Sequence, residues 1–204
     1  MQIVRVKNQF KFSRDTGTAC MPISILAIFH LYSQRERLLD DDDWTLIMQN
    51  GGRLWLKWHA MYGHKHTYPA ADEVLSLKEC KKFVELFGDT PKEYCEWATN
   101  TEYGDKLRGS LISMFQDVEK YVTVERKNVA CLITLPPVSC ISVSSFRPNE
   151  YQYFDSHGNG FSDYCDFAIY SDYTQVIRKI FTRYKLSELE KNSFCSYSAM
   201  LFVK

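Results

Sequence analysis

The apolar and polar positions divide this chain into a helical first half and a strand-rich second half. Met21 to Ser33 is apolar on almost every side of a helix, which predicts a central helix that is buried all round. Pro22 fits this helix because the first turn needs no backbone N–H donor. Apolar residues also recur at helical spacing in Ala71 to Phe87 and in Asp105 to Tyr121, and each pattern predicts a further helix.

A run of four aspartates, Asp40 to Asp43, comes directly before Trp44 to Asn50, and Gly51 and Gly52 follow. Carboxylates at the first turn and glycine after the last one are typical helix boundaries. The pattern therefore predicts a short helix that begins at the aspartates and ends at the glycines. The same acidic run is also suited to attract a basic partner, and the two roles are compatible.

The second half shows the patterns of β-strands. Apolar runs of strand length and period-two alternation are separated by turn residues. They predict strands at Val129 to Leu135, Val138 to Phe146, Tyr151 to Asp155, Asp166 to Tyr170 and Phe194 to Val203. Tyr173 to Tyr184 has helical spacing instead. Helices first and an antiparallel sheet later predict an α+β fold, and the length predicts a single domain over residues 1–204.

The composition narrows the classes of function. Lysine plus arginine and aspartate plus glutamate number 25 each among the 204 residues, so the formal net charge is zero. A general nucleic-acid-binding protein carries a basic surplus, so we expect no nucleic-acid partner. The sequence begins without the apolar stretch of a signal peptide, and no apolar run approaches the roughly 18 residues of a membrane span. We therefore expect no membrane partner, and we expect a monomer.

Cysteine and histidine usage points to free thiols and away from metal. The seven cysteines are odd in number and include no Cys-x-x-Cys pair, which predicts an intracellular, reducing compartment. His59, His64 and His66 form a loose cluster without the second ligand pair that a zinc site needs. The sequence has no phosphate-binding loop and no dinucleotide fingerprint. We expect neither a metal nor a cofactor.

Two short motifs carry the elements of thiol chemistry. Cys20 opens the predicted buried helix, where the positive end of the helix dipole favours a thiolate. Asp155 and His157 are two residues apart at the end of a predicted strand, so their side chains share one side while Ser156 points away. Gly158 then predicts an exposed turn. Taken singly, each motif also fits a plain structural role, as a buried free thiol or as a surface turn.

A third candidate lies upstream of the cysteine. Gln9 precedes Cys20 by eleven residues, and an amide side chain in that position is able to donate to the oxyanion of a tetrahedral intermediate. Asn8 is its immediate rival for this role. Either residue equally fits an ordinary polar loop.

The order of Gln9, Cys20 and the Asp155-x-His157 motif resembles the herpesvirus tegument-type deubiquitinases and their tegument-like relatives, which are papain-like cysteine proteases. In that family a glutamine closely precedes the cysteine, and an Asp-x-His motif on a strand supplies the histidine. The likeness covers most of residues 1–60 and 125–204. Ala19 departs from the glutamine that often precedes the cysteine in the viral proteins.

The resemblance implies a papain-like fold and a cysteine-type deubiquitinase that cleaves after the C-terminal glycine of ubiquitin or polyubiquitin. Cys20, His157 and Asp155 would form the triad, with Gln9 as the oxyanion donor. The cleft for a Gly-Gly tail needs bulky walls and the tail is basic, which makes candidates of Trp55, Trp58, Tyr153, Asp41 and Asp42. The alternatives are a thiol protease for another ubiquitin-like modifier and a non-catalytic ubiquitin-binding module. The expected location is the cytoplasm or nucleus of a host cell, and also the virion for a viral source.

Overall fold

The computed structural model describes residues 5–12, 19–34, 37–62, 98–103, 107–135, 139–158, 163–186 and 197–203. Within them the chain forms one antiparallel six-stranded sheet with the strand order β1-β6-β2-β3-β4-β5. The strands are β1 (Ala98–Tyr103), β2 (Val129–Leu135), β3 (Ser139–Arg147), β4 (Glu150–Asp155), β5 (Asp166–Tyr170) and β6 (Tyr197–Val203). Mixed helices and antiparallel strands confirm the predicted α+β class.

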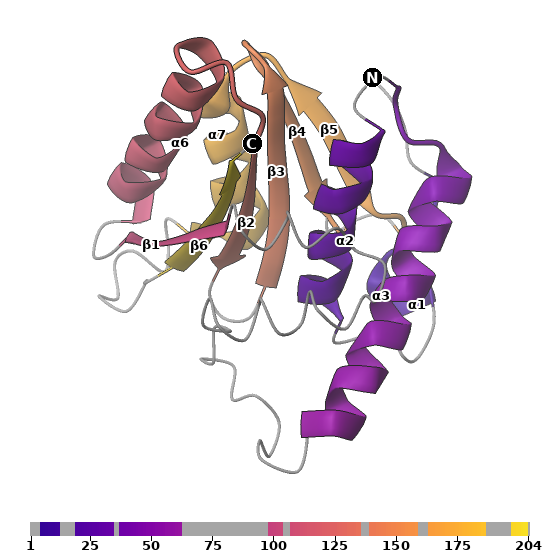
Figure 1. Ribbon diagram of the computed structural model, residues 1–204. Coiled ribbons are helices and arrows are strands. Elements are labelled where there is room, and N and C mark those ends of the chain that lie inside the picture. Colours follow the sequence, from indigo (N-terminus) through magenta and orange to yellow (C-terminus); the bar gives the residue numbers. More distant parts are fainter. Residues whose placement is uncertain are drawn as a thin grey trace.

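The helices cover both faces of the sheet. Figure 1 shows α6 and α7 on one face and α2 and α3 on the other. The helix bounds are α1 (Gln9–Phe12), α2 (Cys20–Ser33), α3 (Asp41–Tyr62), α6 (Leu107–Thr123) and α7 (Tyr173–Tyr184). None of these described helices combines the length and apolar character that a membrane span requires.

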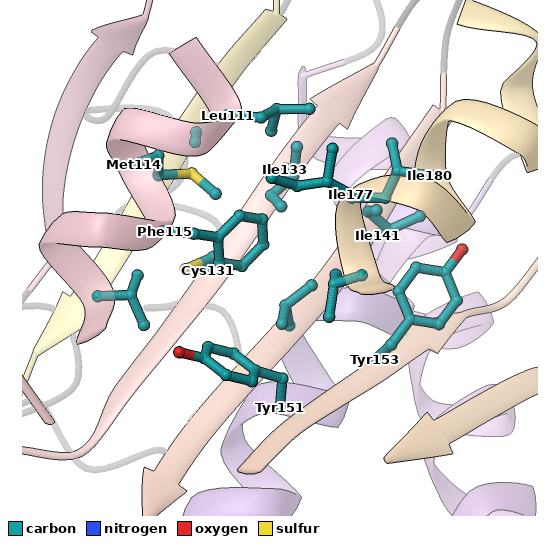
Figure 2. Packing of buried hydrophobic residues seen from close by; sticks show 14 of the residues in the cluster. Leu111, Met114, Phe115, Cys131, Ile133, Ile141, Tyr151, Tyr153, Ile177 and Ile180 are labelled. Carbon is teal, nitrogen blue, oxygen red and sulfur yellow. The ribbon is translucent and has the colours of Figure 1, made fainter. Parts of the chain in front are cut away.

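Strand alternation gives the two faces separate apolar cores. Tyr151 and Tyr153 of β4 point into the core beneath α6 and α7, together with Phe115. Figure 2 shows side chains of α6 and α7 that meet those of β2, β3 and β4 there, and Ala199 and Leu201 of β6 belong to the same core. Phe154, the next residue of β4, belongs to the opposite core and stacks on Trp44 of α3, with 4.6 Å between ring centroids. The sheet is thus buried on both sides along β4, the strand that leads to the Asp-Ser-His motif.

The predicted buried helix is confirmed as α2. Ten of its fourteen residues are buried, and it lies between the sheet and α3. Its few polar side chains have partners: Ser24 Oγ donates to the carbonyl of Cys140 at 3.1 Å, and Tyr32 Oη donates to the carbonyl of Phe202 at 2.8 Å. Apolar packing against β3 and α3 therefore fixes the direction in which α2 begins.

The predicted end of the acidic helix at Gly51 and Gly52 is wrong, because α3 continues through both residues to Tyr62. A side chain at Gly51 would meet Ile23 of α2, with the added Cβ only 3.0 Å from the Ile23 Cα and in collision with Cγ1. Gly51 is therefore buried where the two helices approach closely. The glycine serves helix packing here instead of helix termination.

The remaining patterns are confirmed with small shifts at the ends. The strands from Val129 and Asp166 and the helix from Tyr173 have the predicted bounds, whereas β3 and β4 begin and end within one residue of them. β1 was not predicted: its sequence Ala-Thr-Asn-Thr-Glu-Tyr is polar, and it forms a strand by pairing with β6 at the edge of the sheet. The helix predicted over residues 71–87 lies outside the described residues.

Candidate active site

The Asp155-Ser156-His157 motif forms a buried turn at the end of β4. Asp155 Oδ1 accepts a hydrogen bond from the backbone N–H of His157 at 2.8 Å and from its ring Nδ1–H at 2.7 Å. The predicted pairing of the two side chains is present, but its cause differs from the predicted one. The strand ends at Asp155, so a local turn, and not strand alternation, brings the carboxylate and the imidazole together. The expected exposed turn is wrong: Asp155 is fully buried and His157 is only 8% exposed.

The second oxygen of Asp155 is held by α7 and by its own strand. Oδ2 accepts from Tyr184 Oη at 2.8 Å and from Tyr153 Oη at 3.3 Å, and the Arg183 guanidinium lies 3.6 Å away. Arg183 Nε also donates to the carbonyl of Gly158 at 2.7 Å. The last turn of α7 therefore holds the motif on both sides of His157. Burial, then the charge of Asp155 and the hydrogen bond to it, raise the pKa of Tyr184, which keeps the hydroxyl protonated and able to donate.

Sequence reasoning missed the contributions of Arg183 and Tyr184. The helical spacing of α7 marks its buried residues, such as Ile177 and Ile180, and gives no sign that the last turn reaches a residue 28 or 29 positions earlier. In the sequence, Arg183 and Tyr184 have the spacing of ordinary surface residues at the end of an amphipathic helix. Only the tertiary packing of α7 against β4 shows their target.

Cys20 begins α2 and lies beside the His157 side chain, close enough to raise its pKa. Burial lowers the pKa of His157, but the hydrogen bonds and charges of Asp155 and Cys20 outweigh it and raise that pKa to about 9. The helix cap is Ala19, which has no side-chain acceptor, and the first turn has no acidic residue. The positive helix end next to the sulfur therefore keeps its effect on an anion. Because Nδ1 is bonded to Asp155, Nε2 is the nitrogen that is able to exchange a proton with the sulfur.

Gln9 is tied to the same turn from the N-terminal segment. It is 1% exposed, its backbone N–H donates to the carbonyl of Ser156 at 2.8 Å, and its Oε1 accepts from Ser156 Oγ at 2.6 Å. Ser156, expected to point away from the pair, is fully buried and links Gln9 to it. The bond to Oε1 sets the orientation of the amide and makes Nε2 the donor end.

Asn8, the rival of Gln9, has a structural task. Its Oδ1 accepts from the backbone N–H groups of Phe10 at 3.1 Å and Lys11 at 3.2 Å, and its carbonyl accepts from Phe12 at 2.8 Å. This is the pattern of a residue that caps the first turn of α1. The Asn8 side chain therefore orders the helix on which Gln9 lies.

The aromatic residues proposed as cleft walls do not share one environment. Tyr153 is fully buried with its hydroxyl on Asp155, so its prediction as a wall is wrong. Trp55 is half-buried against the core between α2 and α3. The side chain of Trp58 lies outside the described residues.

The histidine cluster also lies outside them, since His64, His66 and the side chain of His59 are not described. Over the part of the chain that is described, no group of histidine, cysteine or carboxylate side chains is arranged to hold a metal ion.

The acidic run contains two capping residues, Asp40 and Asp43, on either side of Asp41 and Asp42. Asp43 N–H donates to Asp40 Oδ1 at 3.0 Å, and Asp40 N–H donates to Asp43 Oδ2 at 2.9 Å, which is a reciprocal helix cap. Arg37 binds both oxygens of Asp43 at 2.6 and 2.8 Å. Asp41 and Asp42 between them are exposed, and Asp41 accepts from the backbone N–H of Arg5 at 3.0 Å. Capping therefore rests on the outer pair.

Comparisons with known proteins bear on the fold. No protein-family model matches the sequence, and no curated protein matches it. Among solved structures, the ubiquitin-specific protease encoded by murine cytomegalovirus tegument protein M48, in complex with a ubiquitin-based suicide substrate, aligns with a TM-score of 0.65 at 14% identity. The match covers 100% of this chain and 87% of that chain. The Pseudomonas avirulence protein AvrPphB aligns with a TM-score of 0.46 at 11% identity, over 96% and 95% of the two chains. The chain thus shares the fold of the cytomegalovirus protease, in keeping with the papain-like fold that the sequence resemblance implies.

Proposed function

We propose that this protein is a cysteine-type deubiquitinase in which Cys20 is the nucleophile and His157 the general base and acid. The observation that carries the proposal is the buried imidazole of His157, hydrogen-bonded to Asp155 and lying beside the thiol at the start of α2. A carboxylate that fixes the tautomer, a base and a nucleophile in series make an activated thiol.

The groups present are sufficient for acyl transfer. His157 Nε2 takes the proton of Cys20, and the sulfur attacks the carbonyl carbon of the scissile amide. The C–N bond then breaks as His157 returns the proton to the leaving nitrogen, which departs as a neutral amine. Water attacks the resulting thioester with His157 as base, the C–S bond breaks, and the proton returns to Cys20. Asp155 transfers no proton and orients the ring.

Gln9 is the proposed oxyanion donor, together with the backbone N–H of Cys20. Ser156 orients the Gln9 amide with its nitrogen as the donor end, and Gln9 is bonded through both its backbone and its side chain to the turn that carries His157. The Asn8 side chain instead accepts from the backbone of α1. A donor held in place before reaction needs no reorganisation when negative charge develops on the carbonyl oxygen.

Ubiquitin is proposed as the substrate on two grounds. The sequence motifs resemble those of the tegument-type deubiquitinases, and the fold is similar to that of a viral protease whose structure holds a ubiquitin-based substrate. Polyubiquitin presents the same C-terminal glycine in an isopeptide bond and falls within the same proposal.

The pKa of His157 sets an expected pH range. A histidine whose pKa is raised to about 9 stays protonated at neutral pH, so it holds the proton that the leaving amine needs. We expect kcat/KM for amide hydrolysis to decline as the pH rises through about 9, because the ring then loses that proton. A pH profile on a ubiquitin amide substrate measures this.

Covalent labelling tests the function directly. The protein is incubated with ubiquitin that carries a C-terminal electrophile, and the adduct is located by mass spectrometry of its peptides. We expect one adduct, on Cys20, and none in Cys20→Ala. Labelling by an electrophile built on another ubiquitin-like modifier, with none by ubiquitin, would replace the substrate. Binding of ubiquitin without an adduct or turnover would leave only a binding module.

A further inference from the structure

Phe10 is an exposed aromatic residue at a nearly closed catalytic centre. Its side chain is 61% exposed, whereas its neighbour Gln9 is 1% exposed and His157 is 8% exposed. The Phe10 ring lies 5.6 Å from the His157 ring between centroids, tilted by 46°. The apolar ring therefore faces solvent while it contacts the imidazole.

The position of this ring is fixed by the backbone of α1. The N–H of Phe10 donates to Asn8 Oδ1 at 3.1 Å, and Asn8 itself is anchored by its N–H to the carbonyl of Asp163 at 2.7 Å. Gln9 is bonded to the turn that carries His157. The ring and the imidazole thus belong to one hydrogen-bonded unit, so their contact is built into the fold.

We propose that Phe10 forms a leaving-group subsite that binds the aliphatic chain of an acceptor lysine, which directs the enzyme toward isopeptide bonds. This inference rests on the proposed hydrolysis by Cys20 and His157. It names the chemical class on the leaving side of the scissile bond: an alkyl amine attached through its ε-nitrogen.

The proton transfer places the leaving group beside Phe10. His157 returns its proton to the leaving nitrogen, so that nitrogen must come within hydrogen-bond reach of Nε2. The first carbons attached to it then lie close to the imidazole, whose centroid is 5.6 Å from that of the Phe10 ring. A lysine side chain offers four methylenes in that position and covers apolar surface with them. A peptide-linked glycine offers one methylene followed by a polar carbonyl, so it gains less from the ring.

Two reporter substrates with the same ubiquitin moiety and different leaving groups separate an effect of Phe10 on the leaving group from an effect on ubiquitin binding or on the catalytic pair. In the first, the ubiquitin C-terminus is joined to the lysine ε-amine of a reporter peptide. In the second, it is joined to the α-amine of a glycine-led peptide. Burial of one to two methylenes corresponds to roughly tenfold in kcat/KM. We expect Phe10→Ala to lose about tenfold on the lysine reporter and less than about twofold on the glycine reporter.

The control variants and the covalent probe complete the test. Phe10→Tyr retains the ring and should retain the preference, and Val124→Ala, an exposed apolar change after α6, should alter neither reporter. Ubiquitin with a C-terminal electrophile has no lysine chain, so it should label Phe10→Ala at the wild-type rate. Equal losses on both reporters, or no loss on either, would overturn the leaving-group subsite while labelling of Cys20 upholds the proposed function. No labelling of the wild-type protein would overturn both.

Discussion

The two segments that carry the candidate catalytic pair are held in place by different forces. Cys20 lies at the start of α2, which is fixed by apolar packing against the sheet and α3. His157 lies in a turn in which both oxygens of a fully buried carboxylate, Asp155, are occupied by hydrogen-bond donors. Apolar packing is spread over many contacts, whereas each donor to a buried carboxylate is costly to lose. A substitution at Cys20 should therefore lower the rate with little change in the free energy of unfolding, whereas a substitution at Asp155 should lower both.

The largest expected effect comes from the nucleophile. Cys20→Ala should abolish turnover, a loss of more than about 10⁴-fold, and leave the free energy of unfolding almost unchanged. Alanine is small and favours helix, so α2 keeps its packing. His157→Ala should approach the same loss. Kinetics on a ubiquitin substrate and urea unfolding of the same preparations measure both quantities, and substantial turnover by a clean Cys20→Ala preparation would remove Cys20 as the nucleophile.

Asp155→Ala provides the contrast within this first prediction. It should cost less in rate than His157→Ala, since Asp155 orients the ring and transfers no proton. It should also lower the free energy of unfolding by about 1–3 kcal/mol or more, because Tyr184 and the His157 N–H lose their acceptor. Equal unfolding free energies for Cys20→Ala and Asp155→Ala would contradict the distinction between the two segments.

The next effect concerns the two neighbouring amides. Gln9→Ala should lower kcat by roughly 10²–10³, the usual consequence of losing one oxyanion donor. Asn8→Ala removes the cap of α1 and should lower the free energy of unfolding by about 1 kcal/mol, with a smaller change in rate. Steady-state kinetics together with thermal unfolding distinguish these outcomes. A silent Gln9→Ala with a slow Asn8→Ala would transfer the oxyanion role to Asn8.

A third prediction tests the apolar segment without touching chemistry. Gly51→Ala should lower the free energy of unfolding by roughly 1–3 kcal/mol, because its Cβ collides with Ile23. In an Ile23→Ala background the same substitution should cost less, so the double-mutant cycle should be non-additive. Denaturant unfolding of the four proteins gives the coupling. An additive cycle would mean that the α2–α3 approach does not depend on Gly51.

The same contrast explains how much could be predicted from the sequence. Periodicity identifies α2, α6, α7 and most strands, because burial of one face leaves a local pattern. Short motifs also identify Cys20 and His157 as candidates. The link from Ser156 to Gln9 joins residues 147 positions apart, and the approach of Gly51 to Ile23 joins two helices. Such contacts depend on where distant segments meet, so no local spacing predicts them.

The smallest expected effect lies at the acidic start of α3. The outer residues Asp40 and Asp43 cap the helix, whereas Asp41 and Asp42 are exposed and make no part of that reciprocal cap. We propose that these two carboxylates attract the basic tail of ubiquitin. Replacing Asp41 and Asp42 with asparagine keeps an acceptor for the N–H of Arg5 and should leave kcat and the unfolding midpoint unchanged. We expect KM to rise roughly two- to fivefold at low salt, since exposed charges contribute up to about 1 kcal/mol.

Salt and a matched control decide this last prediction. The difference in KM should close as ionic strength rises toward physiological values, where charges are screened over about 8 Å. Asp117→Asn, an exposed acid on α6 across the sheet, should leave KM unchanged. An unchanged KM in the double variant at low salt would confine the run to helix capping. A loss confined to thermal stability would show instead that the carboxylates of Asp41 and Asp42 act only on the first turn of α3.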